Sequence, residues 1–155
     1  MPGLITLADR IDRLNAAIGR AAAWLALIIV VLQFALVVVR YVLDTGSIWL
    51  TETVIYANAA LFLLASAWTL SSGGHVRVDV FYAHASARRR AVVDLLGSAL
   101  LLVPFALVLL FLATPFAARS WAILERSQEA SGLPLVFVLK TLIPVFAVMM
   151  ALQGV

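Results

Sequence analysis

The chain has 155 residues, of which 65% are hydrophobic and 12% are charged. A soluble domain of this length could not bury so much apolar surface, so lipid must solvate a large part of it. The net charge of +3 does not indicate nucleic-acid binding, because the arginines stand beside long apolar runs, where basic residues meet anionic lipid headgroups. The absence of cysteine excludes disulfides, thiolate catalysis and thiolate metal sites.

Four long apolar runs predict the fold. Each is near or above the roughly 20 residues that an α-helix needs to cross about 30 Å of hydrocarbon. The segments between them are too short and too polar to form an independent domain. The sequence therefore predicts an all-α integral membrane protein, a four-transmembrane-helix bundle that forms a single membrane domain, 1–155. The expected spans are 21–43, 49–70, 91–118 and 133–155.

Residues 1–20 precede the first span and predict an amphipathic helix lying on the membrane surface. Apolar residues recur at spacings of three and four, and charged residues fill the opposite side. A solvated lead-in helix would show the same periodicity. A cleavable signal peptide is not expected, because the apolar run starts only after residue 20 and is too long. The apolar stripe consists of Leu4, Leu7, Ile11, Leu14 and Ile18.

The first two spans are joined by only a few residues, Asp44–Ile48, and should form an antiparallel hairpin. Trp49 stands at the start of the second span, where an indole ring favours the membrane interface. Arg40 lies about one turn before the tip of the hairpin and Glu52 about one turn after it, which places them at similar depth. We expect an Arg40–Glu52 ion pair, since charges within spans usually have partners. Alternatively, Arg40 extends alone towards the interface.

The loop after the second span begins with two glycines and continues with alternating polar and apolar residues. The glycines end the span, and the alternation suits a short segment pressed on the inner membrane surface. Its polar residues could contact a partner or lipid headgroups; in the simpler interpretation they form a turn that meets water. The candidate interface residues are Gly74, His75, Arg77 and Asp79.

The third run is long enough for a helix of about 42 Å. It should therefore tilt or bend, and Pro104 and Pro115 offer places for a kink. The fourth run contains a further proline, Pro144.

Lys140 lies roughly 10 Å below the outer end of the fourth span. Asn58 of the second span stands at comparable depth and could accept its hydrogen bond. A carboxylate or a backbone carbonyl of another subunit would serve equally. A role in ion coupling has weak support, because carriers line a path with several convergent polar groups.

The arginines indicate the orientation. Seven lie before the first span or in the central loop, and three lie on the other side. Short loops rich in arginine stay in the cytoplasm, so both termini are expected there. The seven are Arg10, Arg13, Arg20, Arg77, Arg88, Arg89 and Arg90, and the three are Arg40, Arg119 and Arg126.

The sequence does not indicate an enzyme. Its two histidines, His75 and His84, both lie in the central loop, whereas a haem held between membrane helices needs histidines within the spans. They also lack the companions of a metal site. No nucleophile–base set, phosphate-binding loop or pair of catalytic carboxylates stands out. We therefore expect no catalytic residues, no cofactor and no metal.

Several motifs occur together in this order. The chain has Arg40, then Trp49-Leu50-Thr51-Glu52, then Gly74-His75-Val76-Arg77-Val78-Asp79, and later Ser131-Gly132-Leu133-Pro134 with Lys140 and Pro144. Together they resemble the small membrane subunit (DctQ-type, or Q component) of tripartite ATP-independent periplasmic (TRAP) transporters. The resemblance spans about 21–153, and the element at 74–79 is its most specific part. The family often has two adjacent acids after the tryptophan, whereas this chain has Thr51-Glu52.

The resemblance implies a secondary transporter of the bacterial inner membrane that takes up organic acids with an ion gradient. A periplasmic binding protein would capture the substrate, and a large multi-span permease subunit would carry the substrate and ion sites. The small subunit would act as a scaffold and anchor for the large one, among membrane lipids. Alternatives are a small subunit of another tripartite carboxylate transporter, a membrane anchor of a redox complex, or a self-sufficient small carrier.

Overall fold

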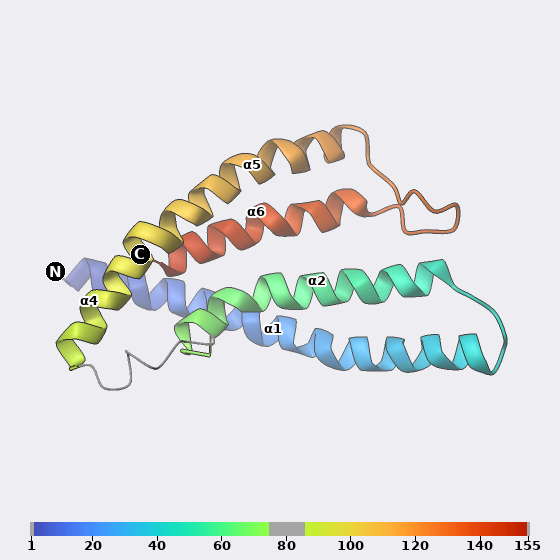
Figure 1. The fold of residues 1–155 in the computed structure, drawn as a ribbon, viewed down its shortest axis with the longest axis horizontal. Helices are drawn as coiled ribbons and strands as arrows, with labels where there is room; N and C mark the ends of the chain where they lie inside the picture. Colours follow the sequence, from blue (N-terminus) through green and yellow to red (C-terminus); the bar gives the residue numbers. More distant parts are fainter. Residues whose placement is uncertain (1, 75–85, 155) are drawn as a thin grey trace.

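The computed structural model describes residues 2–74 and 86–154, and every regular element in these ranges is helical. Four of its helices are long and apolar enough to span a membrane. This confirms the predicted all-α, four-span architecture (Figure 1). The elements in chain order are α1 (Pro2–Tyr41), α2 (Ile48–Ser71), α4 (Ala87–Gly97), the π-helical turn η1 (Ser98–Leu102), α5 (Val103–Ala122) and α6 (Val136–Gln153).

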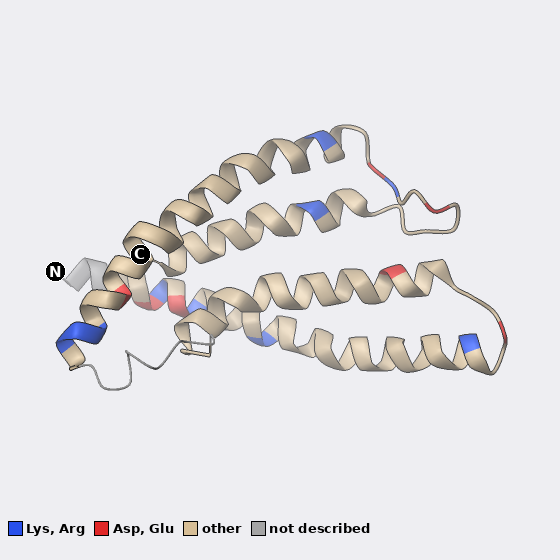
Figure 2. Cartoon of the chain, in the orientation of Figure 1, with Lys and Arg blue, Asp and Glu red and all other residues tan. Residues whose placement is uncertain are grey.

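The helices form two antiparallel hairpins. α1 packs mainly against α2 and α5 against α6, and α6 also packs against α2, which joins the hairpins. The α1–α2 turn and the α5–α6 loop lie at one end of the bundle, here called the hairpin end (Figure 1). Both termini lie at the opposite end, the terminal end. Figure 2 shows most of the charged residues towards these two ends.

The predicted surface helix and the first span form one continuous helix of 40 residues, α1. At 1.5 Å per residue it is about 60 Å long, roughly twice the thickness of the hydrocarbon. The helix expected over 1–20 is therefore not a separate element, because it continues into the first span without a break. Around residue 20 the chain has no proline, and three successive alanines, the best helix formers, follow Arg20.

The third span is continuous from Ala87 to Ala122 but contains one wide turn. In this turn, η1, the backbone N–H of Val103 donates to the carbonyl of Ser98, five residues back. The next residue, Pro104, has no N–H and would crowd the carbonyl four residues before it. The wider turn relieves this crowding, and the helix axis changes direction between α4 and α5 (Figure 1). Pro115 lies within α5 without ending it.

The core consists of small residues and methionines. Ala67, Ala106 and Ala147 are at most 1% exposed, and Met149 and Met150 form one cluster with Ala67 and Ala106. Small residues let membrane helices approach closely, which matters because lipid provides no hydrophobic force between them.

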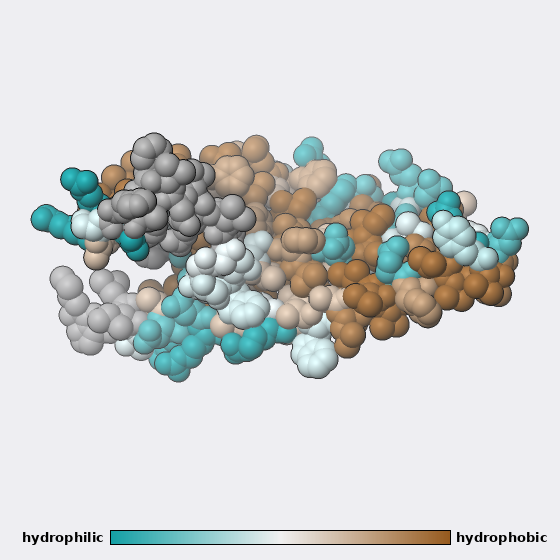
Figure 3. Space-filling model, turned by 60° about the horizontal axis from the view of Figure 1, so that its bottom comes forward, coloured by the Kyte–Doolittle hydropathy of each residue, from teal (hydrophilic) through white to brown (hydrophobic). Residues whose placement is uncertain are grey.

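Close approach is strictest where α1 crosses α2. A Cβ added to Gly19 would stand 2.5 Å from Cβ of Trp68. Around this narrow core, large apolar side chains cover the outer surface. Figure 3 shows one face with a broad hydrophobic area that is interrupted by hydrophilic side chains.

Candidate functional site

The carboxylate of Glu52 fastens one hairpin to the other at the hairpin end. Glu52 stands near the start of α2, where the hydroxyl of Ser47 caps the helix by accepting from Leu50 N at 3.2 Å. One carboxylate oxygen of Glu52 accepts from the backbone N–H of Leu133 at 2.5 Å, and the other accepts from the hydroxyl of Ser127. Both donors belong to the α5–α6 loop. We call these three residues the Glu52 clamp.

The loop is shaped to present both donors. Ser127 N donates to the carbonyl of Leu133 at 3.1 Å, which closes the loop on itself, and Gly132 N donates to Glu129 O at 3.0 Å. A Cβ added to Gly132 would lie 2.8 Å from Glu52 Oε1 and would collide with Ser127. Only glycine leaves room for the carboxylate at this position.

A second polar group joins α5 to α6 near the same end. Lys140 Nζ lies 2.5 Å from Glu125 Oε2 and 4.3 Å from the ring centre of Phe116. Their side chains are only 21% (Lys140) and 30% (Glu125) exposed, so this ion pair is partly shielded from solvent. The Lys140 ammonium, which donates a hydrogen bond to the carboxylate, holds the pKa of Glu125 below its ordinary value.

An unusual helix end brings Glu125 to this position. Glu125 N donates to Ser120 O at 3.0 Å and Leu124 N donates to Trp121 O at 3.1 Å, the two hydrogen bonds of a Schellman motif. The motif needs a residue with positive φ, usually glycine, and here Leu124 occupies it at φ 45°. At the end of α2 the same motif has Gly73 at φ 67°.

Aromatic contacts support the ion pair from the same helices. Trp121 Nε1 donates to Thr141 Oγ1 at 2.8 Å, and the rings of Trp121 and Phe137 meet edge to face with centres 4.5 Å apart. The α5–α6 hairpin is thus tied by an ion pair and by an aromatic pair within about one turn of each other.

A third polar group fastens the hairpins at the terminal end. Asn15 Nδ2 of α1 donates to Gln153 Oε1 of α6 at 2.7 Å, and Gln153 Nε2 donates to Asp12 Oδ1 at 2.7 Å. Asn15 is 1% exposed, so its amide is buried and hydrogen-bonded. We call these three residues the Gln153 clamp. Just beyond it, a Cβ added to Gly154 would stand 2.9 Å from Leu102, which shows that α6 also meets η1 closely.

The predicted Arg40–Glu52 ion pair is not formed. Arg40 is exposed in the last turn of α1, while Glu52 turns to the α5–α6 loop. The structure instead shows an ion pair between Lys140 and Glu125. Equal depth did not suffice for pairing, because the loop offers two hydrogen-bond donors directed at the carboxylate.

The other predicted residues have varied outcomes. Lys140 binds Glu125 of the same chain, not Asn58, which is exposed on α2. Trp49 is 53% exposed at the start of α2. Gly74 follows Gly73 in the Schellman motif and donates to Thr69 O. His75, Arg77 and Asp79 lie outside the described residues.

Sequence reasoning did not assign a binding role to Ser127, Gly132 or the N–H of Leu133. The available signal was the polar stretch 125–132 directly before Leu133-Pro134, which marks the approach to a span. A backbone N–H carries no side-chain signature, so its use by Glu52 is visible only in the fold.

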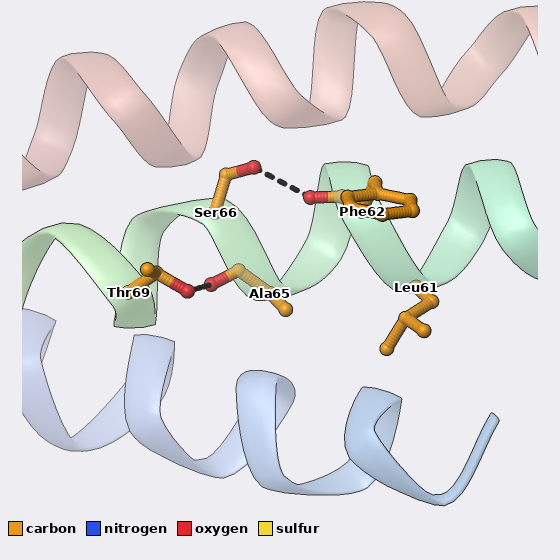
Figure 4. Close-up of a pocket in the computed structure, with 5 residues that line it drawn as sticks. All are labelled: Leu61, Phe62, Ala65, Ser66 and Thr69. Carbon is orange, nitrogen blue, oxygen red and sulfur yellow. Dashed lines mark hydrogen bonds between the residues drawn. The ribbon is translucent and has the colours of Figure 1, made fainter. Parts of the chain in front are cut away.

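A pocket on α2 shows how hydroxyl groups in the spans are used. It has a volume of about 350 Å³, and Figure 4 shows its lining residues on the α2 ribbon, with other helices on either side. Thr69 donates to the carbonyl of Ala65 at 3.0 Å, and Ser66 likewise donates to the carbonyl of Phe62. Both hydroxyls therefore donate to backbone carbonyls of α2 itself, and the pocket that they line is mainly apolar. It is lined by Leu61, Phe62, Ala65, Ser66 and Thr69.

Comparison with known proteins gives one family. The family model described as tripartite ATP-independent periplasmic transporters, DctQ component, matches residues 27–155. No curated protein sequence and no solved structure matches the chain.

Proposed function

Because this chain belongs to the DctQ component family of the tripartite ATP-independent periplasmic (TRAP) transporters, we propose that it is the static scaffold of an organic-acid transporter. The match over residues 27–155 confirms the resemblance noted in the sequence. The chain is a multi-pass protein of the bacterial inner membrane and a small permease subunit. The proposal concerns what this subunit does: it anchors a large permease subunit and does not itself carry the substrate.

The observation that supports a static role is that the two hairpins are fastened to each other at both ends of the bundle. The Glu52 clamp joins α2 to the α5–α6 loop, and the Gln153 clamp joins α1 to α6. A carrier that exposes its site alternately to the two sides must open one end while it closes the other. With polar contacts at both ends, neither end of this bundle opens without losing hydrogen bonds.

The use of charges within the bundle supports the same role. Lys140 and Glu52, the charged residues of α6 and α2, are each bound by a partner in this chain. Intramembrane charges in carriers line a path, whereas these hold helices and a loop in place. The substrate and ion sites would then belong to the large subunit.

The apolar exterior supplies a surface for that subunit. Trp24 and Phe34 of α1 are each 70% exposed, and Phe111 of α5 is 79% exposed. Large aromatic side chains on a transmembrane surface offer extensive packing area to a neighbouring helix.

We place the hairpin end in the periplasm. The arginines of the terminal end indicate a cytoplasmic location by the positive-inside rule, and both termini lie there (Figure 1). The rigid α5–α6 loop would then face a periplasmic substrate-binding protein, and its polar residues, such as Glu129, would be available for docking.

The experiment is reconstitution of the chain, its permease subunit and its binding protein in proteoliposomes with an imposed ion gradient. We expect uptake of a carboxylate only when all three proteins are present. Vesicles with this chain alone should show no uptake, since it would have no substrate path. Uptake by the chain alone, or undiminished uptake by the other two proteins without it, would contradict the scaffold role.

A further inference from the structure

An apolar groove runs along α6 towards the terminal end, and Asn15 of the Gln153 clamp is part of its lining. Its floor is α6 from Pro144 to Leu152, and its walls are Leu14 and Ile18 of α1 and Leu110 of α5. Its volume is about 330 Å³. The groove is open along one side, where it would meet the membrane.

The size of the groove decides what can occupy it. Pro144 and Leu152 are eight residues apart, so the groove follows α6 for about 12 Å. A neighbouring helix is about 10 Å across with its side chains and would enter a groove of about 330 Å³ only with single side chains. A lipid acyl chain is slender enough to lie within it.

The direction of the groove also suits an acyl chain. α1 and α6 run antiparallel, which brings Leu14 of α1 beside Leu152 of α6 at the terminal end, while Pro144 lies deeper. The groove therefore runs along the helices, parallel to the acyl chains of the surrounding leaflet. A chain lying in it would emerge next to Leu14, at the terminal end.

The charge near the Leu14 end of the groove determines which lipid headgroup is favoured. Arg10 is exposed and lies one helical turn beyond Leu14, and four residues at 100° each place it only about 40° around α1 from that leucine. The start of α1, residues 2–20, and the start of the third span, residues 86–97, lie towards the terminal end (Figure 1) and together carry six arginines against three aspartates, a net positive charge. The arginines are Arg10, Arg13, Arg20, Arg88, Arg89 and Arg90, and the aspartates are Asp9, Asp12 and Asp94.

We propose that the groove binds an acyl chain of an anionic phospholipid, whose headgroup phosphate contacts Arg10. The acyl chain replaces the water or loosely packed lipid that would otherwise meet the apolar floor, and the guanidinium favours a negative headgroup. The lipid also covers Asn15 of the Gln153 clamp, which lines the groove. This site depends on the chain and its membrane alone, so it stands whether or not the scaffold role is correct.

The test compares lipid binding by the full chain and four variants in phosphatidylcholine nanodiscs that contain some phosphatidylglycerol. Lipid that stays bound after mild extraction is measured by native mass spectrometry. The wild-type chain should retain phosphatidylglycerol in preference to phosphatidylcholine. Arg10→Gln should reduce that preference about fivefold, the effect of one arginine near an anionic surface. Val148→Trp, which fills the groove at an exposed floor position, should abolish retention.

Two control variants match these changes outside the groove. Arg20 lies about 120° around α1 from Leu14, so Arg20→Gln should leave the preference unchanged. Val108, 58% exposed on α5, does not line the groove, so Val108→Trp should retain the lipid. Equal retention of the two lipids by the wild-type chain, or the same loss in groove and control variants, would overturn the proposal.

A photoreactive residue at position 148 provides a second test that does not depend on filling the groove. In membranes that also contain the permease subunit, a phospholipid adduct at this position would support the lipid site. A crosslink to the permease in place of lipid would show that a protein covers the groove and would overturn it.

Discussion

Replacing Glu52 by glutamine tests the Glu52 clamp most sharply, because the change keeps the shape of the side chain and alters only its hydrogen-bonding chemistry. The two carboxylate oxygens accept from Ser127 Oγ and Leu133 N. Glutamine has one acceptor oxygen, which can keep the hydrogen bond from Leu133 N, while its NH₂ group faces the Ser127 hydroxyl and reverses that hydrogen bond. Both hydrogen bonds therefore lose their charge assistance.

The magnitude follows from two reference values. A hydrogen bond to a charged group contributes about 1.5–3 kcal/mol in soluble proteins. Side-chain hydrogen bonds between membrane helices average about 0.6 kcal/mol. Since Glu52 lies in a part-buried position at the end of the bundle, we expect Glu52→Gln to lower the free energy of unfolding by about 1–3 kcal/mol.

The assay is equilibrium unfolding in mixed micelles, followed by tryptophan fluorescence, with a double-mutant cycle between Glu52→Gln and Ser127→Ala. A coupling energy of at least about 0.5 kcal/mol is expected for a direct contact. Glu129→Gln is the matched control, because Glu129 is an exposed residue of the same loop. A coupling energy of zero, or an equal loss in the Glu129 variant, would refute the reasoning.

Three further predictions follow from the helix ends and the charges. The double exchange Arg40→Glu with Glu52→Arg should not restore the stability lost in Glu52→Arg, because these side chains do not pair. Unfolding experiments measure this, and restored stability in the double variant would show that the two residues do form an ion pair. The lowered pKa of Glu125 contributes stability that is complete above the ordinary carboxyl value of 4.5 and is lost as the pH falls through the folded value. Glu125→Gln should therefore flatten the acid side of a plot of Tm against pH, and identical acid profiles would argue against the ion pair. Leu124 and Gly73 both have positive φ, so Leu124→Gly should raise the free energy of unfolding by up to about 1 kcal/mol, and Gly73→Ala should lower it by about 1 kcal/mol. Thermal unfolding measures both changes, and changes of the opposite sign would contradict the positive φ at these helix ends.

The spans were predictable from the sequence because of one physical constraint. In lipid, a spanning segment must satisfy its own backbone hydrogen bonds, so a long apolar run has little choice except a helix. The boundaries were less certain where a helix could continue past the apolar run. Nothing around residue 20 stops α1, so the surface segment and the span share one helix. Pro104 predicted where the helix bends, but the sequence did not predict that a π-helical turn would form there.

The partners of the charged residues were only partly predictable. Sequence spacing gives the depth of Arg40 and Glu52 in a hairpin, but not the side of the helix from which a third segment approaches. Glu52 is bound by donors 75 and 81 residues further along the chain, one of them a backbone N–H. Lys140 was correctly expected to need a partner, and a carboxylate from another subunit was among the alternatives. Its actual partner, Glu125, is placed by a leucine in a conformation that leucine seldom adopts.

The most direct test of the static role is to lock the two hairpins together and measure transport. Thr51 of α2 and Glu129 of the α5–α6 loop are exposed and line the same pocket at the hairpin end, and the chain has no cysteine of its own. With both replaced by cysteine and bridged by a short bifunctional maleimide, the subunit is reconstituted with its permease and binding protein. Uptake equal to that of the unbridged double variant is the predicted result. A loss of uptake that appears only after bridging would show that the hairpins must move apart during transport, and would contradict the scaffold role.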